Sequence, residues 1–66
     1  MIIEARVVTG SDKGMLTVLD SEGNRVTDVN RSLTSRDLWG YKGQIEVKPE
    51  GGRTAFYINE KRVYPV

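Results

Sequence analysis

Aromatic and basic side chains gather in the second half of the chain and form its clearest candidate binding chemistry. Flexible cations neutralise phosphates and exposed rings stack on unpaired bases, so an interleaved set of both is typical of nucleic-acid-binding surfaces. Residues 31–66 carry seven basic and four acidic side chains, whereas residues 1–30 carry three basic and five acidic ones. The candidate binding surface consists of Arg36, Trp39, Tyr41, Lys42, Arg53, Tyr57, Lys61, Arg62 and Tyr64.

The same side chains are equally suited to binding protein. In peptide-binding SH3 domains, aromatic rings from loops and a short helical turn line a groove for proline-rich segments. The cores of protein interfaces also favour Tyr, Trp and Arg. Trp39 has a structural interpretation as well, because it follows Leu38 and could close one end of a small core. We favour a non-catalytic interaction module that binds a protein partner or its own copy, and nucleic-acid binding is the alternative.

No combination of residues predicts catalysis. The chain has no histidine, so the usual proton shuttle is missing and no serine has a histidine to activate it. Lys13 lies between Gly10 and Gly14, but a phosphate-binding loop needs Gly-Lys-Ser/Thr followed by a helix. Here an apolar, β-branched stretch follows instead. We therefore expect no enzyme activity and no cofactor.

A metal site is not expected either. Zinc sites depend mainly on cysteine and histidine, which are absent. Four carboxylates in the first half lack the dense spacing and the closing glutamate of a calcium loop, and we interpret them as solvated turn residues. They are Asp12, Asp20, Glu22 and Asp28.

Charge and hydropathy indicate where the protein acts. Its net charge is +1, which neither favours nor opposes a polyanionic partner. Charged residues within the first six positions and the lack of a following apolar run predict no secretion signal. No stretch of about 18 apolar residues is present to span a membrane. We expect a cytoplasmic protein with no membrane partner.

Hydrophobic residues alternate with polar ones at a period near two, which predicts strands. Glycine-rich polar turns separate the strands, and the one at residues 20–24 is typical of a type I turn followed by a left-handed glycine. Val26 and Val29 break the alternation, which predicts a bulge or an early strand end. The expected strands are residues 2–9, 15–19, 25–29, 44–48, 54–58 and 62–66, with turns at 49–52 and 59–61.

Residues 30–41 do not fit a strand. Ser32 or Ser35 could cap a short helical turn over Arg36–Leu38 that Gly40 ends. Five or six short strands and one short helical turn or long loop near residues 31–40 favour a single all-β domain over residues 1–66. We predict a small SH3-like barrel, since closure removes exposed sheet edges, with an OB-like barrel as the alternative and an open sheet completed by dimerisation as the third architecture.

Two segments resemble part of a known family. Gly40–Val47 and Arg62–Val66 are similar to the latter half of the plasmid-encoded type II dihydrofolate reductases. The resemblance implies an SH3-like barrel that self-associates. In that family the functional motif is Val-Gln-Ile-Tyr; here Arg62 stands at the glutamine position and only Tyr64 matches among the polar members. The resemblance therefore implies fold and association but not reductase activity.

Overall fold

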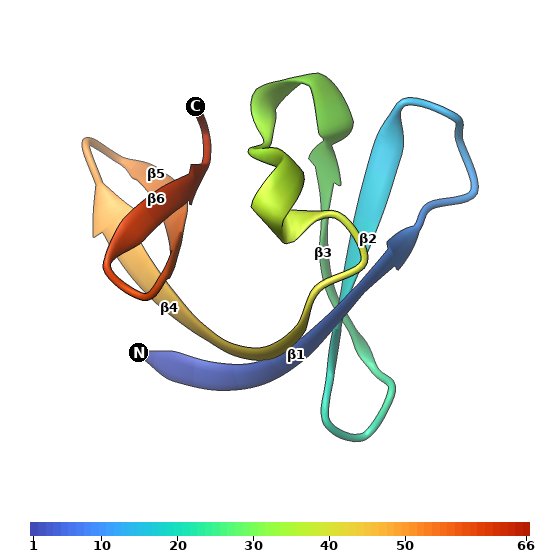
Figure 1. Cartoon of the computed structure of the whole chain (residues 1–66), viewed down its shortest axis with the longest axis horizontal. Helices are drawn as coiled ribbons and strands as arrows, with labels where there is room; N and C mark the ends of the chain where they lie inside the picture. Colours follow the sequence, from blue (N-terminus) through green and yellow to red (C-terminus); the bar gives the residue numbers. More distant parts are fainter.

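The protein is built from six antiparallel strands in one sheet, as a computed structural model of residues 1–66 shows (Figure 1). The spatial order of the strands is β3-β2-β1-β4-β5-β6. The strands are β1 (Ile2–Thr9), β2 (Met15–Asp20), β3 (Arg25–Asn30), β4 (Lys42–Glu50), β5 (Arg53–Ile58) and β6 (Lys61–Tyr64). The all-β prediction is thus confirmed. The structure contains no helix with the length and apolar character that a bilayer crossing requires.

The sheet curls because β1, its long central strand, pairs with a strand of each half. The latter part of β1 pairs with β2 and its first part pairs with β4. Figure 1 shows the result: the β5–β6 hairpin lies on the left, the β2–β3 hairpin on the right, and β1 and β4 cross below them. The two edge strands, β3 and β6, share no backbone hydrogen bonds. The fold is consistent with a small SH3-like or OB-like architecture, but the predicted barrel does not close.

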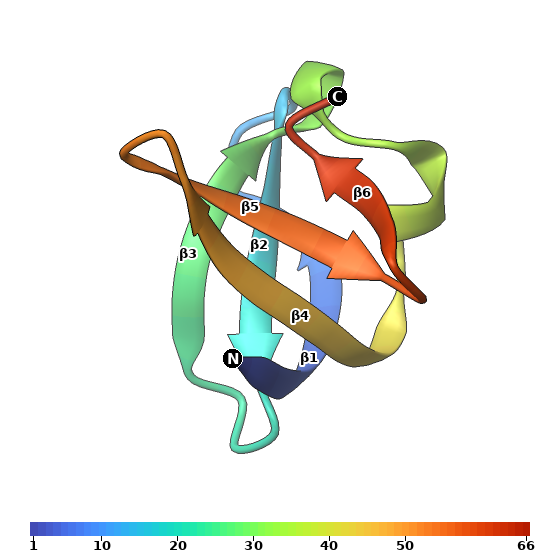
Figure 2. The same cartoon turned by 90° about the vertical axis from the view of Figure 1, so that its left-hand side faces the viewer.

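Two single-turn 3-10 helices occupy the gap between the hairpins: η1 (Arg31–Leu33) and η2 (Arg36–Leu38). The hydroxyl of Ser35 accepts a hydrogen bond from the Asp37 backbone N–H at 3.3 Å, so Ser35 caps η2 as predicted. The Ser35 backbone N–H donates to the Val63 carbonyl, and the Val66 N–H donates to the Leu33 carbonyl, both at 2.8 Å. Residues 31–39 therefore cover the free edge of β6, and Figure 2 shows them running beside that strand.

The turns follow their sequence signatures closely. Gly23 adopts the left-handed conformation (φ 82°), and the Asp20 carboxylate accepts backbone N–H bonds from Glu22 and Asn24. Between β5 and β6, Asn59 and Glu60 both have positive φ and form the predicted tight hairpin. The turn expected at 59–61 is shorter, because β6 begins at Lys61, and β6 ends at Tyr64, two residues before the predicted end at Val66. The turn at 49–52 is shorter than expected too. There β4 continues through Glu50, which pairs with Arg53, because two left-handed glycines suffice to reverse the chain.

The predicted irregularity in β3 is a bulge. Val18 pairs with Thr27 and Leu19 pairs with Arg25, which leaves Val26 as the extra residue. Inserting a residue changes the direction in which a bulged strand presents its side chains. Val26 is accordingly 47% exposed, although it lies between residues that pair in register.

The core is a cluster of ten buried side chains drawn from all six strands and from η2: Ala5, Val7, Leu16, Val18, Val29, Leu38, Ile45, Phe56, Ile58 and Val63. Leu38 is fully buried, whereas its neighbour Trp39 is 42% exposed and lies outside the cluster. The interpretation of Trp39 as a lid is therefore wrong. A 3-10 turn sends adjacent side chains in different directions, and here it directs the leucine inward.

Candidate functional site

The nine side chains of the candidate binding surface do not form one face. Tyr57 and Arg62 lie on the outer face of β5 and β6, and Arg53 and Tyr64 line a groove beside β3. Tyr41 and Lys42 lie at the start of β4. The remaining three, Arg36, Trp39 and Lys61, lie on or against η2, where Lys61 pairs with Asp37 at 3.3 Å.

Tyr57 and Arg62 are held by a carboxylate. The Tyr57 hydroxyl donates to Glu50 Oε2 at 2.5 Å and Arg62 Nη1 donates to Glu50 Oε1 at 3.4 Å. The Lys48 ammonium lies 4.7 Å from the centre of the Tyr57 ring. The hydrogen bond to Glu50, with partial desolvation and the carboxylate charge, raises the pKa of Tyr57 above its ordinary value of 10.0, and Arg62 partly offsets this. This cluster satisfies its own polar groups.

Tyr41 stabilises the sheet. Its hydroxyl donates to the Gln44 carbonyl at 2.9 Å, and its half-buried ring packs against the core. Gly43 has φ +151°, and a Cβ there would lie 2.8 Å from the Tyr41 hydroxyl oxygen. Only glycine leaves room for the ring, so Tyr41 and Gly43 form a structural pair. Lys42 beside them is exposed.

Two arginine side chains lie over the Trp39 ring. The guanidinium carbons of Arg31 and Arg36 lie 5.3 and 5.8 Å from the centre of its ring. Its indole N–H donates to the Thr34 hydroxyl at 2.7 Å, and Thr34 is only 7% exposed. The sequence pointed to Arg36 and Trp39 but not to Arg31, because Arg31 lies eight positions before the tryptophan and no strand or helix register relates the two.

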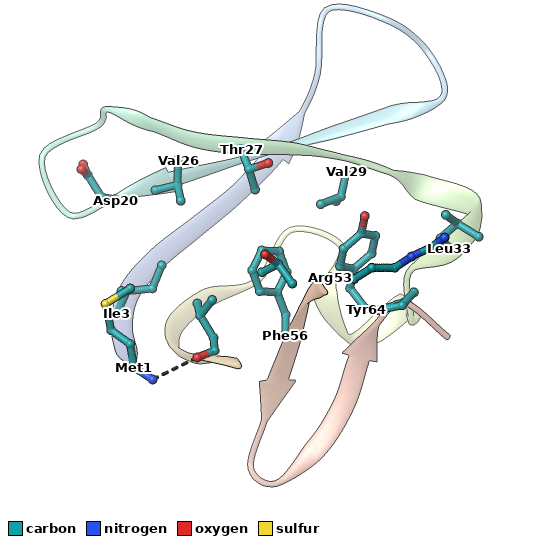
Figure 3. A pocket seen from close by; sticks show the side chains of 13 residues that line it. Met1, Ile3, Asp20, Val26, Thr27, Val29, Leu33, Arg53, Phe56 and Tyr64 are labelled. Atoms are coloured by element: carbon teal, nitrogen blue, oxygen red, sulfur yellow. Dashed lines mark hydrogen bonds between the residues drawn. The ribbon is translucent and has the colours of Figure 1, made fainter. Parts of the chain in front are cut away.

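An apolar groove lies between β3 and the β5–β6 hairpin, where the sheet fails to close (Figure 3). Its volume is about 790 Å³. Val29 and Phe56 form its inner part and Tyr64 packs on Phe56, with ring centres 5.4 Å apart. Val26 and Leu33 line its outer part and are 47% and 43% exposed. The groove exists because residues 31–39 cover β6 and leave β3 uncovered.

Polar groups around the groove are few. Arg53 lines it and makes no ion pair, because its cross-strand neighbour Glu50 is bound to Tyr57 and Arg62. Asp20 lines it too, but its carboxylate holds the turn that follows β2. The groove therefore offers apolar contact and one free guanidinium.

This groove was not predicted from the sequence. Its apolar residues occupy positions that look like ordinary strand and loop residues in the sequence. Only the three-residue spacing of Val26 and Val29 indicated that one side chain leaves the regular strand pattern. Elsewhere, no three carboxylates converge in a way that could hold a metal ion. No protein family, curated protein or solved structure matches the chain.

Proposed function

We propose that the protein is a binding module that captures an extended segment of a protein partner along the free edge of β3. One observation carries the proposal: an uncovered edge strand runs beside an apolar groove. No backbone hydrogen bond reaches the free side of Arg25–Val29, whereas residues 31–39 cover the edge of β6. An unpaired edge accepts an added strand through main-chain hydrogen bonds, and adjoining pockets select its side chains.

The lining of the groove defines the partner's chemistry. An added strand directs alternate side chains to one face, so those facing Val26 and Phe56 would be apolar. The free guanidinium of Arg53 favours a carboxylate in the same segment, since charged groups give specificity when they meet an opposite charge. The expected partner is an extended segment that alternates apolar and polar residues and carries one acidic residue.

A second copy of the chain fits this groove less well. If β3 paired with β3 of another copy, each strand would bring side chains that its own fold already uses. Val29 is 2% exposed and belongs to the core, so it cannot enter the groove of a neighbour. A segment of another protein has no side chains already buried in a core, so all its apolar side chains can point into the groove.

Amide chemical shifts of the isotope-labelled protein, titrated with synthetic peptides, test the proposal. The probe is a blocked peptide of alternating valine and threonine with one aspartate, and the control peptide has serine in place of valine. We expect the valine peptide to shift and protect the amides of Arg25–Val29. Val26→Asp weakens binding about tenfold or more, because the carboxylate occupies the apolar groove. Ile2→Asp is the matched control, since Ile2 is 62% exposed and lies outside the groove.

Three outcomes would contradict the proposal. Equal binding of the serine peptide would show that the groove does not select side chains. Unchanged binding by Val26→Asp would place the site elsewhere. If the protein alone shows concentration-dependent shifts of β3, and sedimentation shows a dimer that Val26→Asp dissociates, the occupant is a second copy.

A further inference from the structure

Trp39 is held rigidly at the surface without belonging to the core. Its indole N–H donates to Thr34, and the Thr34 hydroxyl in turn donates to the Arg31 carbonyl, each at 2.7 Å. The Trp39 backbone N–H donates to the Arg36 carbonyl at 3.0 Å. Three hydrogen bonds thus fix an aromatic ring that remains 42% exposed. A ring ordered in this way loses little conformational entropy when a ligand stacks on it.

Two guanidinium groups lie within 6 Å of the ring centre and have no counter-charge. Arg31 and Arg36 make no ion pair, and neither guanidinium donates a hydrogen bond within the protein. The acidic residue between them, Asp37, pairs with Lys61. Each guanidinium therefore keeps five N–H donors free. Two like charges held over one ring repel each other, and an anion between them would relieve that repulsion.

We propose that Arg31, Trp39 and Arg36 form a binding site for single-stranded nucleic acid. Planar guanidinium groups bind phosphate oxygens in a bidentate fashion, and an aromatic ring stacks on an unpaired base. Because each arginine is tethered only by a weak contact with the ring, a base can replace one guanidinium over Trp39 while that guanidinium moves to a neighbouring phosphate. A phosphopeptide would use the two cations but not the exposed ring.

The site is independent of the groove beside β3, which contains none of these three residues. Failure of one proposal therefore leaves the other standing. Arg6 is exposed on β1, makes no ion pair and lies outside the groove, so it is the matched control for a basic residue elsewhere on the surface. Duplex DNA hides its base faces and would gain only the phosphate contacts.

Trp39 is the only tryptophan, so its fluorescence reports this site directly. We expect oligothymidylate to quench it, and the affinity to fall with salt. Two phosphate contacts on a single strand predict a slope of log affinity against log salt of about −1.4, or about a 25-fold loss per tenfold rise in salt. Arg36→Gln reduces this slope to about −0.7, and Arg31→Gln with Arg36→Gln abolishes quenching. Arg6→Gln leaves both affinity and slope unchanged.

Trp39→Leu separates stacking from charge. Measured by mobility shift, it weakens binding about tenfold while the salt slope stays near −1.4. Circular dichroism confirms that each variant is folded; if either glutamine variant is not, Arg31→Lys and Arg36→Lys replace it, and loss of tight binding with charge retained supports bidentate contact.

Several results would overturn the proposal. One is the absence of quenching at low salt, where such binding is strongest. Another is full binding by the double glutamine variant. Equal quenching by inorganic phosphate, or quenching by a phosphopeptide but not by oligothymidylate, would show an anion site that does not recognise nucleic acid.

Discussion

Leu38 and Trp39 are neighbours in sequence, and the structure assigns them opposite roles that mutation can separate. Leu38 has no exposed surface and belongs to the core cluster, so Leu38→Ala leaves a cavity that the surrounding side chains cannot refill. Such truncations cost about 2–5 kcal/mol. Trp39→Phe keeps an aromatic ring at this position and removes one hydrogen bond to Thr34, which is worth about 1 kcal/mol.

These losses are a large fraction of the protein's free energy of unfolding. A domain of 66 residues has a free energy of unfolding of about 3–10 kcal/mol, so Leu38→Ala removes a substantial part of it. Each kcal/mol lost lowers the Tm of a domain of this size by about 4–8 °C. Trp39→Phe therefore lowers the Tm by about 4–8 °C, and Leu38→Ala lowers it by about three times as much.

Urea unfolding followed by far-ultraviolet circular dichroism measures both variants without relying on tryptophan fluorescence. The slope with urea stays constant if both variants unfold from the same compact state. A loss for Trp39→Phe equal to or greater than that for Leu38→Ala would refute the assignment. It would mean that the tryptophan fills the core and is not free to meet a ligand.

Two further predictions concern the sheet. Gly43→Ala lowers the free energy of unfolding by about 2 kcal/mol in urea, because Gly43 has φ +151° and a Cβ would meet the Tyr41 hydroxyl. Gly14→Ala, where a Cβ meets nothing and φ is not positive, is neutral or slightly stabilising. Since the pKa of Tyr57 is raised on folding, its contribution to stability is complete below pH 10.0 and is lost as pH rises through the higher folded value. Tyr57→Phe removes that alkaline decline in a pH series of thermal unfolding, whereas an unchanged decline would exclude Tyr57 as its cause.

The strands and turns could be predicted from local sequence because local rules determine them. In β5 the alternation puts Phe56 and Ile58 on one face of the strand, and both belong to the core. Short-range turn chemistry located the left-handed glycine at position 23 and the hairpin at Asn59–Glu60. Even the bulge in β3 followed from a break in the pattern at Val26.

The surfaces could not be predicted, because they depend on long-range register and on which edge is covered. The pairing of β5 with β6 shifts register between Phe56 and Tyr57, and Val63 points into the core. As a result Tyr64 packs on Phe56 and lies away from Tyr57. Ala55 shares the outward face of Tyr57, which lies two residues further along β5. It is nevertheless buried, because Lys48 lies opposite it and extends its side chain toward the Tyr57 ring.

The segment from Arg31 to Trp39 connects both proposals to the unclosed sheet. It covers β6 through a backbone hydrogen bond to Val63 and holds Val66, beyond the end of that strand, through a second one, so β3 does not pair with β6 and retains its free edge. The same segment places Leu33 in the groove and leaves Arg31 and Arg36 over Trp39. A barrel closed by direct pairing of β3 with β6 would have neither surface. The feature that departs most from the predicted barrel is therefore the one that creates both candidate binding sites.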